Sequence, residues 1–120
     1  MSRIFTDKNG LAVNALSGLI ENNPFVNPLV DAEGHVYTVH TEKGISQIVH
    51  QMGPVPANGV NGLTTEAVLA MEIHRIKYLN DKFPCGENEA AINYMTAALN
   101  VLNERTAKRE ARGVEGQNVV

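Results

Sequence analysis

The chain of 120 residues contains little cysteine, little positive charge and no long apolar run. Its single cysteine, Cys85, cannot form an internal disulfide, so we expect a protein of a reducing compartment such as the cytosol. The formal net charge is −3, whereas a general nucleic-acid binder needs a broad basic surface. The stretch "GLAVNALSGLI" is too short to span a bilayer, and the start of the chain lacks the apolar run of a signal peptide. These absences predict a cytoplasmic protein whose partners include neither nucleic acid nor membrane.

Motifs for metal binding and covalent catalysis are also missing. The histidines His35, His40, His50 and His74 lack a zinc-ligand spacing such as HExxH. Cys85 lies in a short loop and carries no signal of a nucleophile, because a catalytic thiol needs a positioned base. The phosphate-cradling motif GxxxxGK[ST] is absent as well. We therefore expect no metal, no cofactor and no catalytic residue.

The apolar content of 43% is ordinary for a folded protein, and at this length it predicts one compact domain. We expect this domain to span residues 1–120, with a strand-rich part at 1–62, helices at 63–116 and a tail at 117–120. The predicted fold class is α+β, with antiparallel strands followed by a long antiparallel two-helix hairpin. Because a core of this size is modest, we expect copies to associate through the helices.

Turn signals and alternating apolar residues mark the first half as strands. Asn9-Gly10 lies between two short apolar runs, which is a strong hairpin signal. The stretch "HVYTVH" alternates between two faces and follows a turn at Gly34, and "ISQIVHQM" is a further strand that ends before Gly53-Pro54. The proline-containing stretch "ENNPFVNPL" reads as a loop. A helical turn within residues 11–21 is the alternative to a strand there.

Helical spacing governs the second half. After a turn at "GVNG", Thr64 is a suitable N-cap, and Glu66 in the first turn suits the helix dipole. Apolar residues then recur at Leu69, Ile73, Ile76 and Leu79. The stretch "DKFPCGEN" breaks this helix. Such a short break predicts an antiparallel helical hairpin.

A second helix is expected from about Glu87 to Arg112, with Gly113 as the residue that ends it. Its apolar stripe is predicted at residues 91, 95, 98 and 102, with Ile92 and Leu99 beside it. This near-heptad spacing suits packing against another helix.

Three arginines, Arg105, Arg109 and Arg112, continue that stripe at spacings of 3, 4 and 3 after Leu102. One interpretation is structural: they neutralise the C-terminal helix dipole and pair with neighbouring glutamates, among them Glu104. The other is a site for an anion, because the planar guanidinium binds phosphate through two hydrogen bonds. The residues alone leave the two interpretations equally open.

An anionic ligand needs further contacts, and the start of the same helix offers them. Asn88 could bind a base edge or a hydroxyl group, and Tyr78 or Phe83 could stack on a base, although core packing is the plainer role for an aromatic residue. Asn88 and Arg105 are 17 positions apart, roughly 25 Å along a helix. A small nucleotide can therefore contact both only if a second copy, packed antiparallel, supplies the arginines.

The stretches "QMGPVPANGVNGLTTEAVLA", "FPCGENEAA" and "LNERTAKREARGVEG" resemble the Thoeris anti-defence sponges of phages and prophages. These belong with anti-CBASS sponges that share a related helical hairpin. The resemblance covers about residues 45–116, whereas residues 1–44 match nothing and are interpreted as a lineage-specific addition. It implies a non-catalytic protein that binds and sequesters cyclic nucleotide messengers of bacterial immunity, chiefly glyco-cyclic ADP-ribose isomers. It also implies a homo-oligomer, from a dimer to a hexamer, and in some members separate sites for cyclic di- and trinucleotides.

The resemblance also implies particular ligand-binding residues. The base-stacking aromatic of the family falls on Tyr78, its polar contact on Asn88, and its phosphate-binding arginines on Arg105 and Arg109. Phe83, Thr106 and Arg112 are secondary candidates. The chain departs from the family at Tyr78, where phenylalanine is commoner, and its residues 45–60 contain no lysine or arginine.

Two other functions stay open on the sequence. In a structural or oligomerisation module, the arginines would only stabilise the helix end and pair with Glu104, Glu110 and Glu115. A messenger-degrading enzyme would need an acid–base pair or a metal near the phosphates, and the sequence offers neither.

Overall fold

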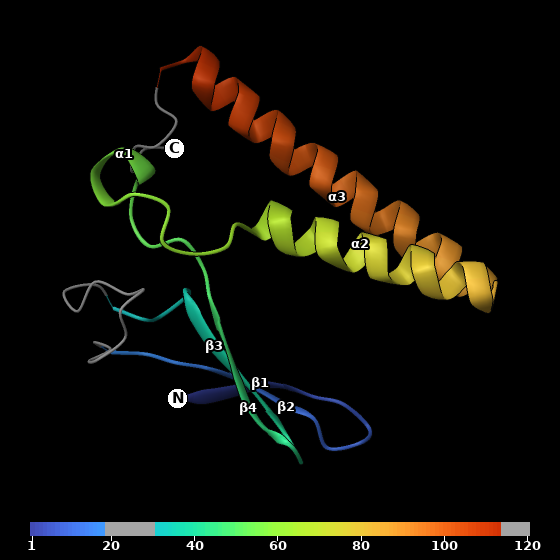
Figure 1. Ribbon diagram of the computed structural model, residues 1–120. Coiled ribbons are helices and arrows are strands. Elements are labelled where there is room, and N and C mark those ends of the chain that lie inside the picture. Colours follow the sequence, from blue (N-terminus) through green and yellow to red (C-terminus); the bar gives the residue numbers. More distant parts are fainter. Residues whose placement is uncertain (19–30, 114–120) are drawn as a thin grey trace. The chain divides into compact units, whose positions relative to one another are not determined.

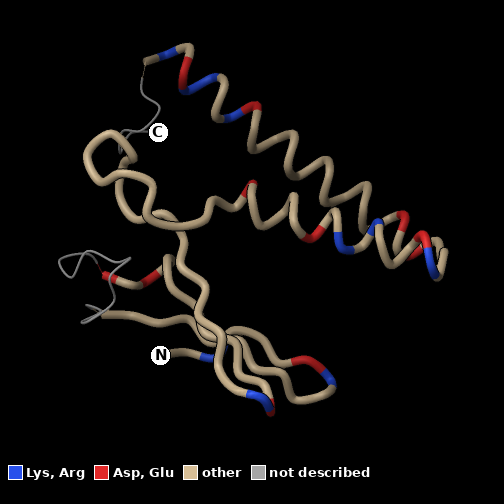
Figure 2. The backbone as a smooth tube through the Cα atoms, viewed as in Figure 1, with Lys and Arg blue, Asp and Glu red and all other residues tan. Residues whose placement is uncertain are grey.

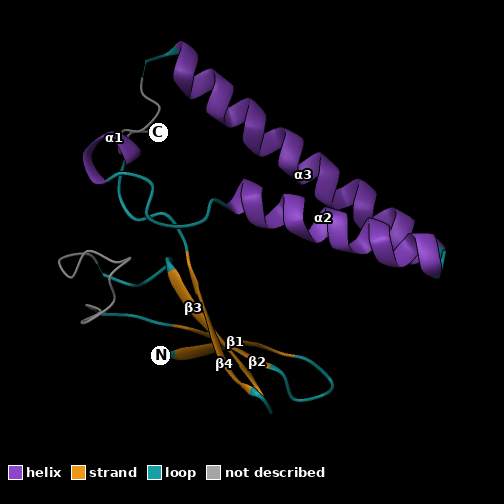
Figure 3. Ribbon diagram, in the orientation of Figure 1, coloured by secondary structure: helices purple, strands orange, loops and turns teal. Residues whose placement is uncertain are grey.

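The computed structural model describes residues 1–18 and 31–113 of the chain (Figure 1). The chain divides into two compact units, Met1–Leu63 and Thr64–Val120. Within the described residues, the first contains four strands and the second two long helices, so the α+β class predicted from the sequence is confirmed (Figure 3). The predicted loop "ENNPFVNPL" and the tail at 117–120 lie outside the described residues.

The strands form one antiparallel sheet in which neighbours in sequence are neighbours in space. Strand β1 spans Ser2–Thr6, β2 Ala12–Ala15, β3 Val36–Thr41 and β4 Gly44–Val49. Because Ala12–Ala15 pairs with both β1 and β3, the alternative of a helical turn within 11–21 is wrong for these residues.

The turns follow the local signals in the sequence. At the β1–β2 turn, the Asp7 carboxylate accepts hydrogen bonds from the backbone N–H of Asn9 at 2.8 Å and of Leu11 at 2.9 Å. Gly10 has φ 84°, a backbone region that favours glycine, so the predicted hairpin turn is confirmed. Gly34 has φ 79° and lies in the turn before β3, also as predicted.

The strand unit has a small apolar core. Ala32, Val36 and Met52 are buried, and Leu16 and Val49 pack against them. The alternation predicted for β3 is confirmed by the hydroxyl oxygen of Thr38, which lies 3.2 Å from Nε2 of His40 on the same face. A core of this extent leaves much of the sheet surface exposed.

The segment after β4 is held by side-chain amides. The Asn61 side chain accepts from the N–H of Met52 at 2.8 Å and donates to the carbonyl of Met52 at 2.9 Å. Gln51 donates to the Gly59 carbonyl at 2.8 Å and accepts from the N–H of Asn61 at 3.0 Å. A short helix, α1 at Val55–Asn58, lies within this segment and was not predicted. Pro56, in its first turn, presets a helical φ, whereas four residues are too few to show a periodic pattern.

The second unit is the predicted helical hairpin. Helix α2 spans Thr65–Lys82 and α3 spans Gly86–Ala111, and the two pack against each other. Thr64 caps α2 by accepting from the N–H of Ala67 at 3.1 Å, which confirms the predicted N-cap. The predicted apolar stripe of α2, Leu69, Ile73, Ile76 and Leu79, is buried or half-buried. Among the described residues, no helix has the length and apolar character needed to cross a membrane.

The buried stripe of α3 differs from the predicted one. Half-buried or buried residues recur at 88, 92, 95, 99, 102, 106 and 109, a regular spacing of 4 and 3, and Ala90, Ala91 and Thr96 beside them are also half-buried. The predicted stripe through residues 91, 95, 98, 102 and 105 is wrong for Ala98 and Arg105, which are exposed. Both patterns share Met95 and Leu102. Where the two patterns part, the helix half-buries Leu99 and exposes Ala98, because leucine removes more apolar surface from water than alanine does.

Candidate functional site

The aromatic residues near the hairpin bend are exposed. Tyr78, on α2, has 52% of its surface accessible, and Phe83, just after α2, has 74%. Core packing, the plainer role considered for these residues, is therefore wrong for both within one chain. The ammonium nitrogen of Lys82 lies 4.7 Å from the centre of the Tyr78 ring. This end of the hairpin thus presents aromatic surface that a flat base could cover.

A short network of hydrogen bonds fixes the start of α3. The side-chain oxygen of Asn80 accepts from the N–H of Cys85 at 3.0 Å, and the Cys85 sulfur accepts from the N–H of Asn88 at 3.4 Å. The N–H of Phe83 donates to the carbonyl of Leu79 at 2.8 Å. Asn88 is half-buried in the first helical turn. The bend therefore holds Asn88 at a defined position relative to α2.

The arginines lie at the other end of α3, where Figure 2 shows the basic residues close together. They differ in exposure. Arg105 and Arg112 are exposed, whereas only 7% of Arg109 is accessible, and Thr106 is half-buried. Gly113 has φ 72° and follows the capping residue Arg112, so the predicted helix end is confirmed. Within one chain, the guanidinium of Arg105 is therefore open to solvent, whereas Arg109 is buried.

Glu104 forms an ion pair with Lys108, in which the ammonium nitrogen is 2.9 Å from the carboxylate oxygen. The hydrogen bond from Lys108, together with its charge, lowers the pKa of Glu104 below the ordinary value. Under the structural interpretation, Glu104 would pair with an arginine. The structure shows an ion pair of Glu104 with Lys108.

The two sets of candidate residues are far apart within one chain. Helix α3 is continuous from Gly86 to Ala111, so Asn88 and Arg105 are separated by 17 residues, about 25 Å. Tyr78 and Phe83 belong to the Asn88 end. Helix α3 is also eight residues longer than α2, with 26 against 18 residues (Figure 1). The structure therefore groups the candidates at two ends and does not bring the two groups together in one chain.

Sequence reasoning missed two features of the hairpin. Lys82 is not among the predicted site residues, although its position four residues after Tyr78 is the spacing at which helical side chains meet. Tyr94 and Val101 are 76% and 63% accessible. With Ala98 and Arg105 they form an exposed stripe at spacings of 4, 3 and 4, one position before the buried stripe. Because the prediction from spacing placed Ala98 and Arg105 on the buried face, it did not identify this exposed stripe.

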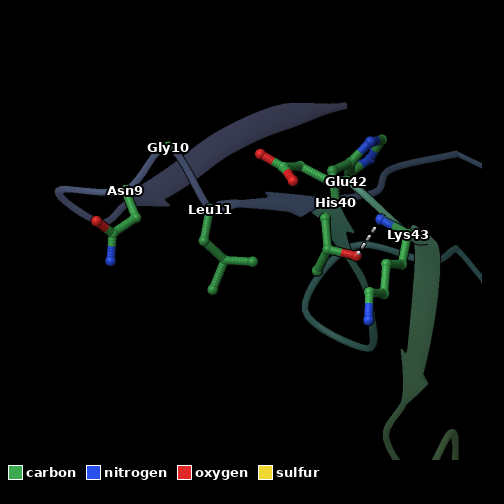
Figure 4. A pocket seen from close by; sticks show the side chains of 7 residues that line it. Asn9, Gly10, Leu11, His40, Glu42 and Lys43 are labelled. Carbon is green, nitrogen blue, oxygen red and sulfur yellow. Dashed lines mark hydrogen bonds between the residues drawn. The ribbon is translucent and has the colours of Figure 1, made fainter.

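The strand unit contains an open pocket of about 750 Å³ between the β1–β2 turn and the β3–β4 turn (Figure 4). Its lining residues are all exposed or half-buried: Asn9, Gly10, Leu11, His40, Thr41, Glu42 and Lys43. The Thr41 hydroxyl in its wall accepts from the N–H of Lys43 at 3.2 Å. None of the candidate ligand residues belongs to this pocket.

His35 and His50 contact protein groups. His35 Nδ1 lies 3.1 Å from the Gln51 carbonyl, and the His50 ring packs edge-on against Tyr37 at 5.5 Å between ring centres. Within residues 1–18 and 31–113, no group of three or more His, Cys, Asp or Glu side chains could hold a metal ion.

No protein-family model matches the chain. The chain is 42% identical over 103 residues to "Thoeris anti-defense 1" of Bacillus phage SBSphiJ7, a match that covers 78% of this chain and 72% of the relative. Residues 45–120 make up less than two thirds of the chain, whereas the match covers 78% of it. The match therefore includes part of the first 44 residues. The interpretation of residues 1–44 as a lineage-specific addition is therefore wrong for at least part of them. By this identity and coverage, the chain belongs to the Thoeris anti-defence family.

Proposed function

We propose that this protein is a non-catalytic sponge that binds glyco-cyclic ADP-ribose isomers in the cytoplasm of an infected bacterium and so inhibits Thoeris defence. Membership of a family named for anti-defence supports this role. The ligand class follows from the residues. A base needs an aromatic surface, a diphosphate needs fixed cations, and the hairpin offers each at one of its ends.

The observation that carries the proposal is the separation of these two ends. Tyr78 and Asn88 lie at the bend, whereas Arg105 and Arg109 lie about 25 Å away along α3. In a two-fold dimer with antiparallel hairpins, the arginine end of one copy meets the bend of the other, and the symmetry makes two equal sites. In each site Tyr78, with Phe83 beside it, stacks on the base and Asn88 binds a polar edge. Arg105 and Arg109 bind the phosphates, with Thr106 and Arg112 as secondary contacts.

These residue types suit binding better than cleavage. Guanidinium groups donate hydrogen bonds and accept none, and a carboxamide side chain neither gives up nor takes a proton in ordinary acid–base catalysis. A pocket built from them holds a cyclic nucleotide without breaking it. Sequestration by mass action is enough to keep the messenger away from its effector.

The two arginines have unequal parts. Arg105 is exposed, so it can reach a phosphate without displacing other side chains. Arg109 is 7% accessible, so its removal also disturbs packing in the free protein. Arg105 is therefore the residue whose substitution tests binding alone.

The test is a calorimetric and thermal-shift panel of cyclic ADP-ribose, its glyco-cyclic isomers and cyclic di- and trinucleotides. A ligand that binds only the folded protein raises its melting temperature. We expect at least one glyco-cyclic isomer to bind, to be recovered intact after denaturation, and to be lost in Arg105→Ala while the oligomer persists. A cleaved product would support the enzyme. Absence of binding across the panel, with assembly disturbed in Arg105→Ala, would support the structural module.

A further inference from the structure

The ring of Tyr78 already carries a cation in the free protein. The ammonium nitrogen of Lys82 lies 4.7 Å from the ring centre, within the range of a cation–π contact. Lys82 is the last residue of α2, one turn after Tyr78 and directly before the bend that leads to Asn88. Both Tyr78 and Lys82 are exposed. The cation thus lies over the aromatic residue of the candidate site, on a residue that lies between Tyr78 and Asn88 in the sequence.

The ammonium group of Lys82 is a rare positive charge in an acidic stretch of the chain. Between Tyr78 and Arg105, Lys82 is the only lysine or arginine of the chain. Three acidic residues lie near the bend, Asp81, Glu87 and Glu89, whereas Glu104 belongs to the arginine end of α3. Glu87 and Glu89 lie in the first turn of α3, beside Asn88. An anionic nucleotide that reaches the bend therefore meets a region that is net negative even with Lys82 present.

We propose that Lys82 is a further ligand-binding residue, whose ammonium group binds the phosphates of a nucleotide whose base stacks on Tyr78. This inference rests on the proposed function and deepens it. The ring holds the ammonium beside the site before the ligand arrives, so less side-chain freedom is lost on binding than for a lysine in open solvent. A base that stacks on the covered face moves the ammonium off the ring, and the phosphates then become its partner. The site consequently has a cation at each end, Lys82 from one copy and Arg105 from the other.

If Lys82 had only a structural role, its substitution would affect stability and not the salt dependence of ligand binding. As a basic residue in the last turn, Lys82 favours the C-terminal dipole of α2 whatever the ligand does. Loss of that effect lowers the stability of the hairpin but leaves the salt dependence of ligand binding unchanged. Loss of a phosphate contact, in contrast, lowers affinity and makes it less sensitive to salt, because one screened charge pair is gone.

The experiment is calorimetry with the tightest-binding cyclic ADP-ribose isomer at low and high salt, on the full chain. The variants are Lys82→Gln, Lys82→Arg and Tyr78→Ala, with Lys77→Gln as the matched control, because Lys77 is an exposed lysine of the same helix. We expect Lys82→Gln to bind about tenfold more weakly, with a flatter salt dependence. Lys82→Arg should keep most of the affinity, and Lys77→Gln should bind as the wild type does. Circular dichroism melts confirm that each variant is folded.

The outcomes separate this inference from the function on which it rests. If the wild type binds and Tyr78→Ala does not, but Lys82→Gln keeps both the affinity and the salt dependence, the role of Lys82 is refuted and the sponge stands. Weaker binding of Lys82→Gln with an unchanged salt dependence also refutes it, in favour of the structural role. If the wild type binds no member of the panel, both proposals fail together.

Discussion

The sulfur of Cys85 accepts a hydrogen bond from the backbone N–H of Asn88 at 3.4 Å, which makes the only cysteine of the chain the N-cap of α3. The N–H of Cys85 is in turn bound by the side chain of Asn80 at 3.0 Å. The position of Asn88 therefore depends on two side chains outside the candidate ligand-binding set, Asn80 and Cys85. In this arrangement the thiol has a conformational role.

Cys85→Ser is expected to keep the helix cap, because a serine hydroxyl is a good N-cap acceptor. Cys85→Ala removes the acceptor and should destabilise the hairpin by about 0.5–1 kcal/mol. Urea unfolding curves of the two variants measure the difference. Equal stability of the alanine and serine variants would contradict a capping role for the thiol.

Arg105→Ala and Arg109→Ala should separate binding from stability. Arg105 is exposed, so its truncation should change the free energy of unfolding by no more than about 0.5 kcal/mol. Arg109 is 7% accessible, and its truncation should cost about 1–3 kcal/mol through lost packing and partners left unpaired. Thermal melts without ligand measure both effects. Equal melting temperatures of the two variants would show that the burial of Arg109 does not contribute to stability.

Single residues in the sequence were enough to predict where several elements begin or end. Thr64 and Gly113 mark helix ends through backbone needs that one residue satisfies, and Asn9-Gly10 marks its turn in the same way. The rotation of α3 about its axis was not predictable from spacing, because two heptad patterns share Met95 and Leu102. Packing against α2 decides between them. The same choice exposes Arg105.

The candidate site was only partly accessible to sequence reasoning. The distance between Asn88 and Arg105 follows from helix geometry alone, and the continuous α3 leaves it unchanged. The exposure of Tyr78 and the position of Lys82 over its ring depend on side-chain conformations, which spacing does not fix. The hydrogen bond from the N–H of Cys85 to the Asn80 side chain likewise joins the end of α2 to the start of α3.

Gly62→Ala should destabilise the strand unit. A Cβ atom added at Gly62 would lie 2.5 Å from the carbonyl carbon of His50, which is backbone and cannot rotate away. The flanking chain is fixed, because the N–H of Gln51 donates to the Leu63 carbonyl at 2.8 Å. We expect a loss of about 1–3 kcal/mol, measured by urea unfolding. Gly86→Ala is the matched control, since nothing lies within 4 Å of an added Cβ there; a similar loss in both variants would contradict the steric explanation.

The ion pair of Glu104 and Lys108 predicts a small pH effect. Because Lys108 lowers the pKa of Glu104 in the folded chain, the pair contributes stability above the ordinary carboxyl pKa. That contribution is lost as pH falls through the lowered value. Carboxyl titration by NMR should show the Glu104 pKa rising toward its ordinary value in Lys108→Gln and staying low in Lys108→Arg. An unchanged pKa in Lys108→Gln would show that the pair does not form in solution.

A mixture of two defective variants tests whether each site is shared between copies. Tyr78→Ala removes the stacking end and Arg105→Ala removes the phosphate end, so each variant alone should capture no ligand. When the two are co-expressed in equal amounts, a site made from two neighbours has about one chance in four of receiving Tyr78 from one copy and Arg105 from the other. We therefore expect about a quarter of the wild-type binding capacity at wild-type affinity, measured by calorimetry on the mixed oligomer. A Tyr78→Ala,Arg105→Ala double variant mixed with either single variant is the control and should remain inactive. If the co-expressed single variants bind nothing although they assemble together, the site does not lie between copies, and the 25 Å separation along α3 would have to be bridged in another way.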